Sequence, residues 1–240
     1  AIAGILTVLM TFFLVKELFR TPSTSYLLSL ISSLLLAISP WHINISRAGF
    51  EANIALFFIV LGVYVVLRAE YKPRYWFVAW LPFVAAVYTF NSARYFAPMF
   101  GLVLCIRMRK SISGNWKSFV LGIALAAIFM LPIVPHLLSK EARLRFAEVN
   151  IFTDASVVTT ANDRIALDKQ SVWGKLFDNR RVGYSISYLR HYADNLQPSF
   201  LFIRGDGNPK FSIQEVGQLY GMEAVFLFIG ILSLFTQYPQ

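Results

Sequence analysis

The chain has 240 residues, of which 57% are hydrophobic and 16% aromatic, and its formal net charge is +9. This composition, combined with repeated charge-free apolar runs, excludes an ordinary soluble domain and predicts an all-α polytopic membrane protein. The single Cys105 excludes an intrachain disulfide. The chain begins without an initiator Met and ends just after an apolar run, so we interpret it as an internal fragment of a longer protein.

Apolar runs that can cross a bilayer as helices recur along the chain, and we expect about seven transmembrane helices. The expected spans are residues 1–19, 25–41, 52–67, 75–90, 95–106, 119–138 and 222–235. The fifth span is short, and Pro98 inside it predicts a tilt or kink.

The cations are divided unequally between the short connections. One set of connections carries nine Lys and Arg residues, whereas the other set carries only Arg47 and Arg94. The nine are Lys16, Arg20, Arg68, Lys72, Arg74, Arg107, Arg109, Lys110 and Lys117. Because Lys and Arg concentrate in short cytoplasmic connections, we expect the first set to be cytoplasmic. The basic excess is then a topology signal and requires no nucleic-acid partner.

The segment after the sixth expected span then faces outward. It is too long and too polar to be a simple connection, so we expect a small extracytoplasmic subdomain over residues 140–221. Residues 1–139 would hold the first six transmembrane helices, and residues 222–240 the final, truncated one.

The most unusual outward connection is SPWHINISRAGFEAN at residues 39–53, which we expect to be a short loop at a membrane face. Charge so close to hydrocarbon is costly unless it is paired or lines a wet cavity, so the loop indicates a site. Glu51 is the candidate catalytic residue, acting as a base, a metal ligand or a cation partner. The alternative is that Glu51 caps the first turn of the next helix, where the helix dipole favours negative charge.

Three neighbours of Glu51 are candidate substrate-binding residues. Arg47 either binds an anionic substrate or pairs with Glu51 or a lipid phosphate. His42 is either a ligand-binding residue or part of an interfacial belt beside Trp41. Asn53 lies with Glu51 at the mouth of the next apolar helix.

A second candidate stretch, YTFNSARYFAP at residues 88–98, contributes Tyr88, Asn91 and Arg94 as substrate-binding residues. Arg94 is either a snorkelling anchor for its helix or a cation held over the same cavity to take a phosphate. We expect it to converge with Arg47 and Glu51 on one outward-facing pocket. Asp206, a further candidate substrate-binding residue, lies in the sequence Gly-Asp-Gly-Asn-Pro, which predicts a turn. The alternatives are a metal-binding turn formed with Asn208 and a plain structural turn.

The stretches at residues 39–53 and 88–98, and the order of helices and loops around them, resemble those of the multi-spanning glycosyltransferases that use lipid-phosphate sugars. That family includes the dolichyl-phosphate-mannose-protein mannosyltransferases and the bacterial aminoarabinose transferases of lipid A. In that family, the helix after the second outward loop opens with an Arg followed shortly by an acidic residue. This chain has Arg47 and Glu51 at those places, although the family often has Asp where this chain has Glu. A cation followed by Pro after the next outward turn is matched by Arg94 and Pro98. The resemblance covers essentially the whole chain.

The resemblance implies transfer of a sugar from a polyprenyl-phosphate donor to a lipid, glycan or protein acceptor at the outer face of the cytoplasmic membrane. Arg47 and Arg94 would stabilise the leaving phosphate, and Glu51 would assist the chemistry or bind a divalent metal. The family's principal catalytic acid precedes the region matched here, so it is expected upstream of this chain. The alternatives are a transporter or flippase of an amphipathic anion, which should place polar groups on broken helices near the bilayer middle, and a noncatalytic assembly factor.

Overall fold

The computed structural model of the chain describes residues 1–20, 22–140, 144, 150–167 and 171–237. Helices dominate these residues, and no β-strand occurs among them. The chain divides into two compact units, Ala1–Ile133 with Phe202–Gln240 and Val134–Leu201, and each is described by itself. The expected all-helical class is therefore confirmed.

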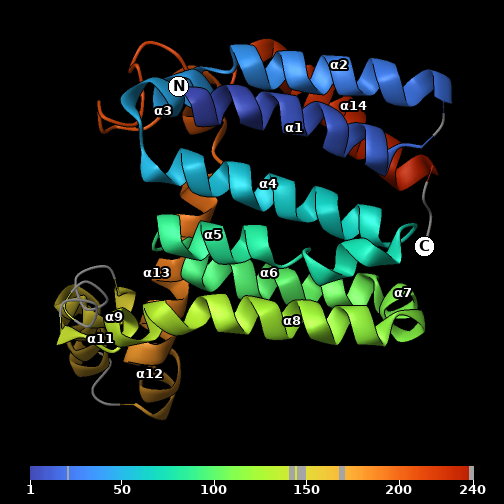
Figure 1. Cartoon of the computed structure of the whole chain (residues 1–240). Helices are drawn as coiled ribbons and strands as arrows, with labels where there is room; N and C mark the ends of the chain where they lie inside the picture. The colour runs from blue at the N-terminus through green and yellow to red at the C-terminus, as the bar shows by residue number, and fades with distance from the viewer. Residues whose placement is uncertain (21, 141–143, 145–149, 168–170, 238–240) are drawn as a thin grey trace. The chain divides into compact units, whose positions relative to one another are not determined.

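The first unit contains the long apolar helices of the chain (Figure 1). Its elements are α1 (Ile2–Leu18), α2 (Pro22–Ile38), α3 (Pro40–Ala48), α4 (Glu51–Ala69), η1 (Pro73–Phe77), α5 (Leu81–Thr89), α6 (Ala93–Arg107), α7 (Arg109–Gly114), α8 (Trp116–Met130), η2 (Leu131–Ile133) and α14 (Gly221–Gln237). Helices α1, α2 and α14 have 17 residues each, at the lower limit for a membrane span.

Two helical segments among the described residues are both long and apolar enough to cross a membrane, Glu51–Ala69 and Trp116–Leu137. A third is obtained if the pair Ser25–Ile38 and Pro40–Ala48, bent by 59°, counts as one span. Membrane-crossing helices are therefore supported, whereas the number of seven spans stays a prediction.

One expected span is interrupted for a clear reason. Residues 75–90 form part of η1, a short turn and then α5, which has only nine residues. Nine helical residues reach about 14 Å, less than half the thickness of the hydrocarbon core. Pro73 begins η1 and Pro82 lies in the first turn of α5, and proline without an N–H favours such helix starts over a continuous helix.

The connection at residues 39–53 is not the expected loop, because most of it forms α3. Pro40 stands at the start of α3 after Ser39 in extended conformation, and Gly49 ends the helix with a φ of 71°. Proline at the first helical position and a left-handed glycine after the last are the usual boundaries of a helix. The chain thus leaves α2, bends at Ser39 and enters a second, polar helix.

Small residues let the helices of the first unit approach closely. A Cβ on Gly62 of α4 would lie 2.6 Å from the ring of Phe83, and one on Gly122 of α8 would clash with the carbonyl oxygen of Trp76 in η1. Close backbone approach at small residues is typical of helix packing in membranes. The buried alanines of this unit are Ala55, Ala69, Ala79, Ala86, Ala93, Ala97 and Ala126.

The cation-rich connections lie at one end of the first unit, where α1, α4 and α6 end (Figure 1). There Glu17 of α1 pairs with Arg20 at 2.7 Å and with Arg68 of α4 at 3.2 Å. The Trp76 indole N–H donates to Ser111 Oγ at 3.3 Å and joins η1 to α7. Helix α3, the start of α4 and the turn between α5 and α6 lie at the opposite end (Figure 1).

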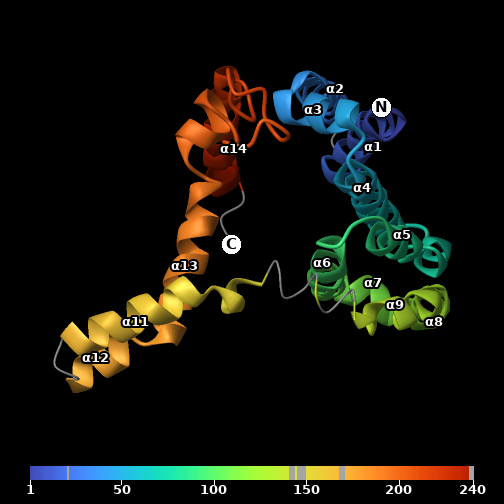
Figure 2. The same ribbon diagram turned by 90° about the vertical axis from the view of Figure 1, so that its left-hand side faces the viewer.

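The second unit is built from short helices. Its elements are α9 (Val134–Leu137), η3 (Ile151–Thr153), α11 (Ala155–Leu167), α12 (Val172–Phe177), α13 (Arg180–Asp194) and the first residues of η4 (Ser199–Ile203). Figure 2 shows α11, α12 and α13 gathered together. Asn179 begins α13, and its Oδ1 accepts the N–H groups of Arg181 and Val182. Hydrogen bonds from Ser156 at the start of α11 hold the pKa of the Asp154 carboxyl below its ordinary value.

Gly122→Ala should destabilise the first unit, because the added methyl group meets the Trp76 carbonyl oxygen. We expect a loss of about 1 to 3 kcal/mol, the usual cost of overpacking, measured as a lower melting temperature in detergent. Gly230→Ala on α14 is the matched control, since open space surrounds that position. It should leave stability unchanged or raise it by up to about 1 kcal/mol through helix propensity. Equal effects of the two changes would contradict the close approach of α8 to η1.

Candidate functional site

Helix α3 places three polar side chains at one end of the first unit, of which His42 and Arg47 are candidates from the sequence. His42 is 3% exposed and lies edge-on to Trp41, with ring centroids 5.5 Å apart. Ser46 follows one turn later on the same face, and Arg47 is exposed at the end of the helix. The bend before α3 therefore brings a buried imidazole, a hydroxyl and a guanidinium together at one end of the unit.

A cavity of about 400 Å³ opens beside this helix. Residues of α1, the end of α2 and α3 line it, and His42, Ser46 and Arg47 are its polar members. The other lining residues are apolar or small, such as Ile5 and Val8 of α1. An apolar cavity with a few polar groups is the usual form of a small-molecule site.

Several buried polar atoms near this cavity have no hydrogen-bond partner among the described residues. They include His42 Nε2, Ser46 Oγ and Asn53 Oδ1. A Cβ on Gly4 of α1 would clash with Ser46 Oγ and lie 3.5 Å from Asn53 Nδ2, so Ser46 and Asn53 are neighbours beneath α1. Because buried polar atoms are normally hydrogen-bonded, such a group of them indicates a place where polar ligand atoms or water bind.

Residues 204–220 contact the outer side of α3. The Gln218 carbonyl oxygen accepts the Trp41 N–H at 3.1 Å and the Ser39 hydroxyl at 3.3 Å. Asn44 Nδ2 donates to the Lys210 carbonyl oxygen at 3.3 Å. These three bonds fix the first turns of α3 to a segment that lies more than 160 residues later in the chain.

Aromatic packing continues this contact. The ring of Phe211 lies 5.3 Å from that of Phe50, which precedes α4. The segment 204–220 is itself tightly turned: Gly205 has a φ of 73°, and a Cβ there would clash with Ser212 Oγ. Phe202–Gln240 is grouped with the first unit, so this part of the expected extracytoplasmic subdomain belongs to the compact unit that contains α3.

Glu51 occupies the first turn of α4 and is exposed. No ion pair joins it to Arg47 within the part of the chain that the structure describes. Neither Glu51 nor Arg94 lines the cavity beside α3, whereas Arg47 does. The expected convergence of these three residues on one pocket therefore remains a prediction.

The second candidate stretch lies at the junction of α5 and α6. The Tyr88 hydroxyl donates to the Phe129 carbonyl oxygen at 2.7 Å and so joins α5 to α8. Asn91 is exposed in the turn, and its carbonyl oxygen accepts the Arg94 N–H at 3.1 Å. Arg94 is partly buried, and its Nε has no hydrogen-bond partner among the described residues. A buried guanidinium nitrogen without a protein partner is open to an anion or to water.

Asp206 forms the turn that its sequence predicts. Its Oδ1 accepts the Asn208 N–H at 2.7 Å, and Asn208 Oδ1 accepts the Lys210 N–H at 3.0 Å. The Asp206 carbonyl oxygen also accepts the Gln214 side-chain amide. These bonds shape residues 204–220 and thereby support the contact with α3.

The donor set for a divalent metal is incomplete in the described ranges. No group of three or more His, Cys, Asp or Glu side chains that could hold a metal ion occurs there. Glu51 supplies a single exposed carboxylate, which is too few ligands for a dedicated site. The residues described therefore do not fit a metal centre.

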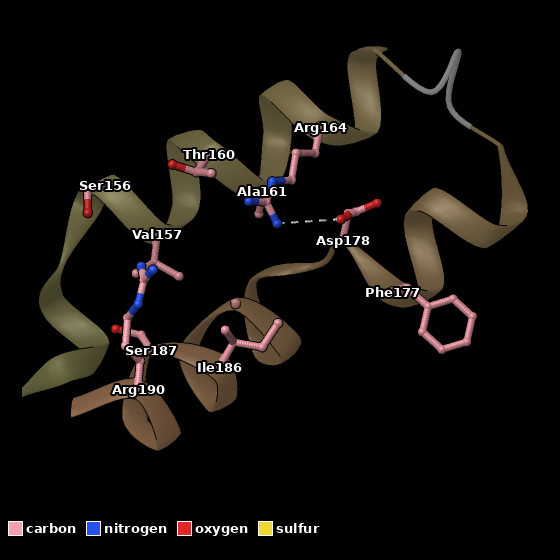
Figure 3. Close-up of a pocket in the computed structure, with 11 residues that line it drawn as sticks. Ser156, Val157, Thr160, Ala161, Arg164, Phe177, Asp178, Ile186, Ser187 and Arg190 are labelled. Atoms are coloured by element: carbon pink, nitrogen blue, oxygen red, sulfur yellow. Dashed lines mark ion pairs between the residues drawn. The ribbon is translucent and has the colours of Figure 1, made fainter. Parts of the chain in front are cut away.

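A smaller cavity, of about 180 Å³, lies between α11 and α13 in the second unit (Figure 3). Arg164 and Asp178 line it and face each other at 3.9 Å, as the dashed line marks. Because this guanidinium is already opposite a carboxylate, the cavity is a weaker candidate than the one beside α3.

Sequence reasoning identified His42, Arg47 and Asn53 but missed Gly4 and Ser46. A glycine facing a polar helix gives no distinctive local pattern, and a serine between an isoleucine and an arginine, as at Ser46, gives none either. Comparison with protein-family models, with curated proteins and with solved structures finds no match to this chain.

Phe211→Ala should loosen residues 204–220 from α3, because it removes the ring that packs on Phe50. An aromatic pair contributes about 0.5 to 1.5 kcal/mol beyond burial, so amide exchange in this segment and at Trp41 should be roughly 2 to 10 times faster. Hydrogen–deuterium exchange with mass spectrometry measures this effect. Phe228→Ala, an exposed ring on α14, is the control and should change neither region. Unaltered exchange in Phe211→Ala protein would show that the ring contact does not hold the segment.

Proposed function

We propose that this chain is part of a membrane glycosyltransferase that moves a sugar from a polyprenyl-phosphate donor to a lipid, glycan or protein acceptor. The observation that supports it best is the group of buried, unpaired polar atoms around α3, beside a largely apolar cavity with Arg47 at its rim. A lipid phosphate has matching chemistry, since its chain is apolar and its head group is an anion that guanidinium groups bind.

The surface of the first unit supports its placement in a bilayer. Large apolar side chains are exposed along α1, α6, α8 and α14, for example Met99 at 72% and Phe235 at 78%. Soluble monomers rarely expose apolar patches larger than a few hundred Å². In contact with lipid chains, these exposed apolar side chains carry no free-energy cost.

The proposed orientation follows from charge. The nine cations of the short connections gather at the end where α1, α4 and α6 end (Figure 1). With that end cytoplasmic, α3 and residues 204–220 face outward, and the reaction takes place at the outer face of the cytoplasmic membrane.

The proposed chemistry uses the groups gathered at the outward end. The acceptor oxygen or nitrogen attacks C1 of the sugar, the bond from C1 to the phosphate oxygen breaks, and its electron pair stays on the phosphate. Arg47 and Arg94 would offset the charge of the leaving phosphate. Glu51 would assist the base that takes the acceptor's proton.

The remaining candidates have positioning roles in this proposal. His42 and Asn53 would hold substrate through their unpaired buried atoms. Tyr88 and Asn91 would shape the turn before Arg94, and Asp206 would shape the segment packed on α3.

A transporter or flippase of an amphipathic anion is the second candidate. Transporters usually place their binding groups near the bilayer middle, on discontinuous helices. Helices α2 and α3, bent by 59°, form a discontinuous pair of this kind, and this observation supports the transporter as the second candidate. The candidate polar side chains of α3 and α4 nevertheless lie together at one end of the first unit (Figure 1), and a position at the membrane face favours an enzyme.

Cysteines introduced at Ala48 and Ser113, after removal of Cys105, should be labelled from opposite sides of the membrane. Both positions are exposed, one at the end of α3 and the other in α7. A membrane-impermeant maleimide added to intact cells should modify the cysteine at position 48 alone. Modification of both positions from outside would overturn the proposed orientation.

Glu51→Gln and Arg47→Gln should each lower sugar transfer by the full-length protein at least about tenfold, since loss of a charged catalytic group typically costs about 10² to 10⁴ in rate. The assay measures transfer from a radiolabelled polyprenyl-phosphate sugar by purified protein. Glu70→Gln and Arg109→Gln make the same changes at the opposite end of the first unit and should retain activity.

A structural cap predicts a different result. If Glu51 acts only through the helix dipole, Glu51→Gln loses about 0.3 to 1 kcal/mol of stability and keeps normal turnover. Full activity of folded Glu51→Gln protein would exclude its catalytic role. Full activity of Arg47→Gln protein as well would leave the transferase proposal without support from α3.

A further inference from the structure

Helix α13 of the second unit presents an aromatic and cationic face. Tyr184, Tyr188 and Tyr192 are spaced four residues apart, so they share one side of the helix. Arg181 precedes Tyr184 by three residues on the same side. Tyr188 and Tyr192 are each 61% exposed, and the adjoining Leu189 is 62% exposed. We call Arg180, Arg181, Tyr184, Tyr188, Leu189 and Tyr192 the α13 face.

A groove of about 810 Å³ runs along most of this face. On its far side are Ile151 and Phe152 of η3. The Tyr184 hydroxyl donates to the Phe152 carbonyl oxygen at 3.0 Å, and the two rings meet edge to face at 5.3 Å. The groove is therefore held in shape by η3, while Phe152 itself is 67% exposed.

The two arginines at the start of α13 have no carboxylate partner in the described part of the second unit. The ion pair that the structure describes in that unit joins Arg164 to Asp178 on the other side of α13. The described residues that line the groove include neither a carboxylate nor a carboxamide side chain. Its chemistry thus consists of exposed aromatic and aliphatic surface with two free guanidinium groups beside it.

This combination fits the interface of an anionic bilayer. Tyrosine is enriched where membrane meets water because its ring is apolar and its hydroxyl is polar. Arginine binds phosphate with paired hydrogen bonds, and an amphipathic helix with both groups lies in the head-group region.

The bilayer is also the surface that this unit meets at the highest effective concentration. The unit begins at Val134, within the apolar segment Trp116–Leu137 that is able to span a membrane. Because the span and this unit belong to one continuous chain, the encounter with the lipid surface is intramolecular.

We propose that the α13 face docks on anionic phospholipid head groups of the bilayer that holds the chain. Arg180 and Arg181 bind lipid phosphates, and Tyr188, Leu189 and Tyr192 enter the interface. The docking rests on membrane insertion of the chain and is independent of the proposed sugar transfer.

The test uses the full chain in nanodiscs of phosphatidylcholine alone and of phosphatidylcholine mixed with phosphatidylglycerol. After Cys105→Ser, a single cysteine replaces Tyr188 and carries an environment-sensitive fluorophore. The control label replaces Asn162, which is exposed on α11. With phosphatidylglycerol, the label at position 188 should shift to shorter wavelength and be quenched by lipid-borne nitroxide, whereas the label at position 162 should do neither.

A matched pair of charge changes separates docking from general loosening. Arg181→Gln should weaken the docking equilibrium about fivefold, the effect of one cation near an anionic surface. Arg190→Gln, on the side of α13 that faces α11, should leave the signal unchanged. Raised salt should reproduce the effect of Arg181→Gln.

Other outcomes overturn the proposal. A label at position 188 that remains water-exposed in anionic nanodiscs would show that the face does not meet lipid. Equal quenching at positions 162 and 188, or quenching independent of phosphatidylglycerol and of Arg181, would show that anionic head groups are not recognised. Protection of the label only by an added soluble glycan would identify a different ligand.

Discussion

The contact that the candidate site depends on is the close approach of α1 to α3 and α4 at Gly4. A side chain at this position would occupy the space of Ser46 and crowd Asn53. Because glycine is there, α1 packs directly on Ser46 and Asn53, and the buried Ser46 Oγ and Asn53 Oδ1 have no hydrogen-bond partner among the described residues, like His42 Nε2 nearby. Burial of this kind costs free energy unless a ligand or water supplies the missing hydrogen bonds.

Two features hold this arrangement from opposite sides. The bend of 59° before α3 turns the polar helix across the end of the unit, and the Gln218 carbonyl oxygen, hydrogen-bonded to Ser39 and Trp41, fixes that bend from outside. At the other end, Glu17 joins Arg20 and Arg68. The two ends therefore differ chemically: one gathers paired and solvated cations, and the other gathers unpaired polar groups beside a cavity.

The sequence predicted what depends on composition and on local rules. Charge-free apolar runs predicted the helical class, and the turn around Asp206 followed from its Asx and glycine residues. Helix α3 could also have been found, because Pro40 and Gly49 bracket it with the usual boundary residues.

Long-range contacts could not be read in the same way. The bond from Ser39 to Gln218 joins residues 179 positions apart, and no local pattern encodes such a pair. The close contact of Gly122 with the Trp76 carbonyl oxygen in η1 likewise depends on where α8 packs, and the sequence of α8 alone does not reveal it. The span expected at residues 75–90 is interrupted because Pro73 begins η1 and Pro82 lies in the first turn of a separate helix. The apolar residues around the two prolines nevertheless predicted one continuous helix.

The central claim is that the end of the first unit that carries α3 and residues 204–220 binds a lipid-phosphate sugar. Photo-crosslinking measures this directly, with a polyprenyl-phosphate sugar that carries a diazirine near its phosphate and with mass spectrometry to locate the adduct. The account predicts adducts within residues 40–53 or 204–220 that unlabelled polyprenyl phosphate abolishes and free sugar does not. Adducts that gather instead at the cationic end, around η1 and α7, or that polyprenyl phosphate fails to displace, would contradict it.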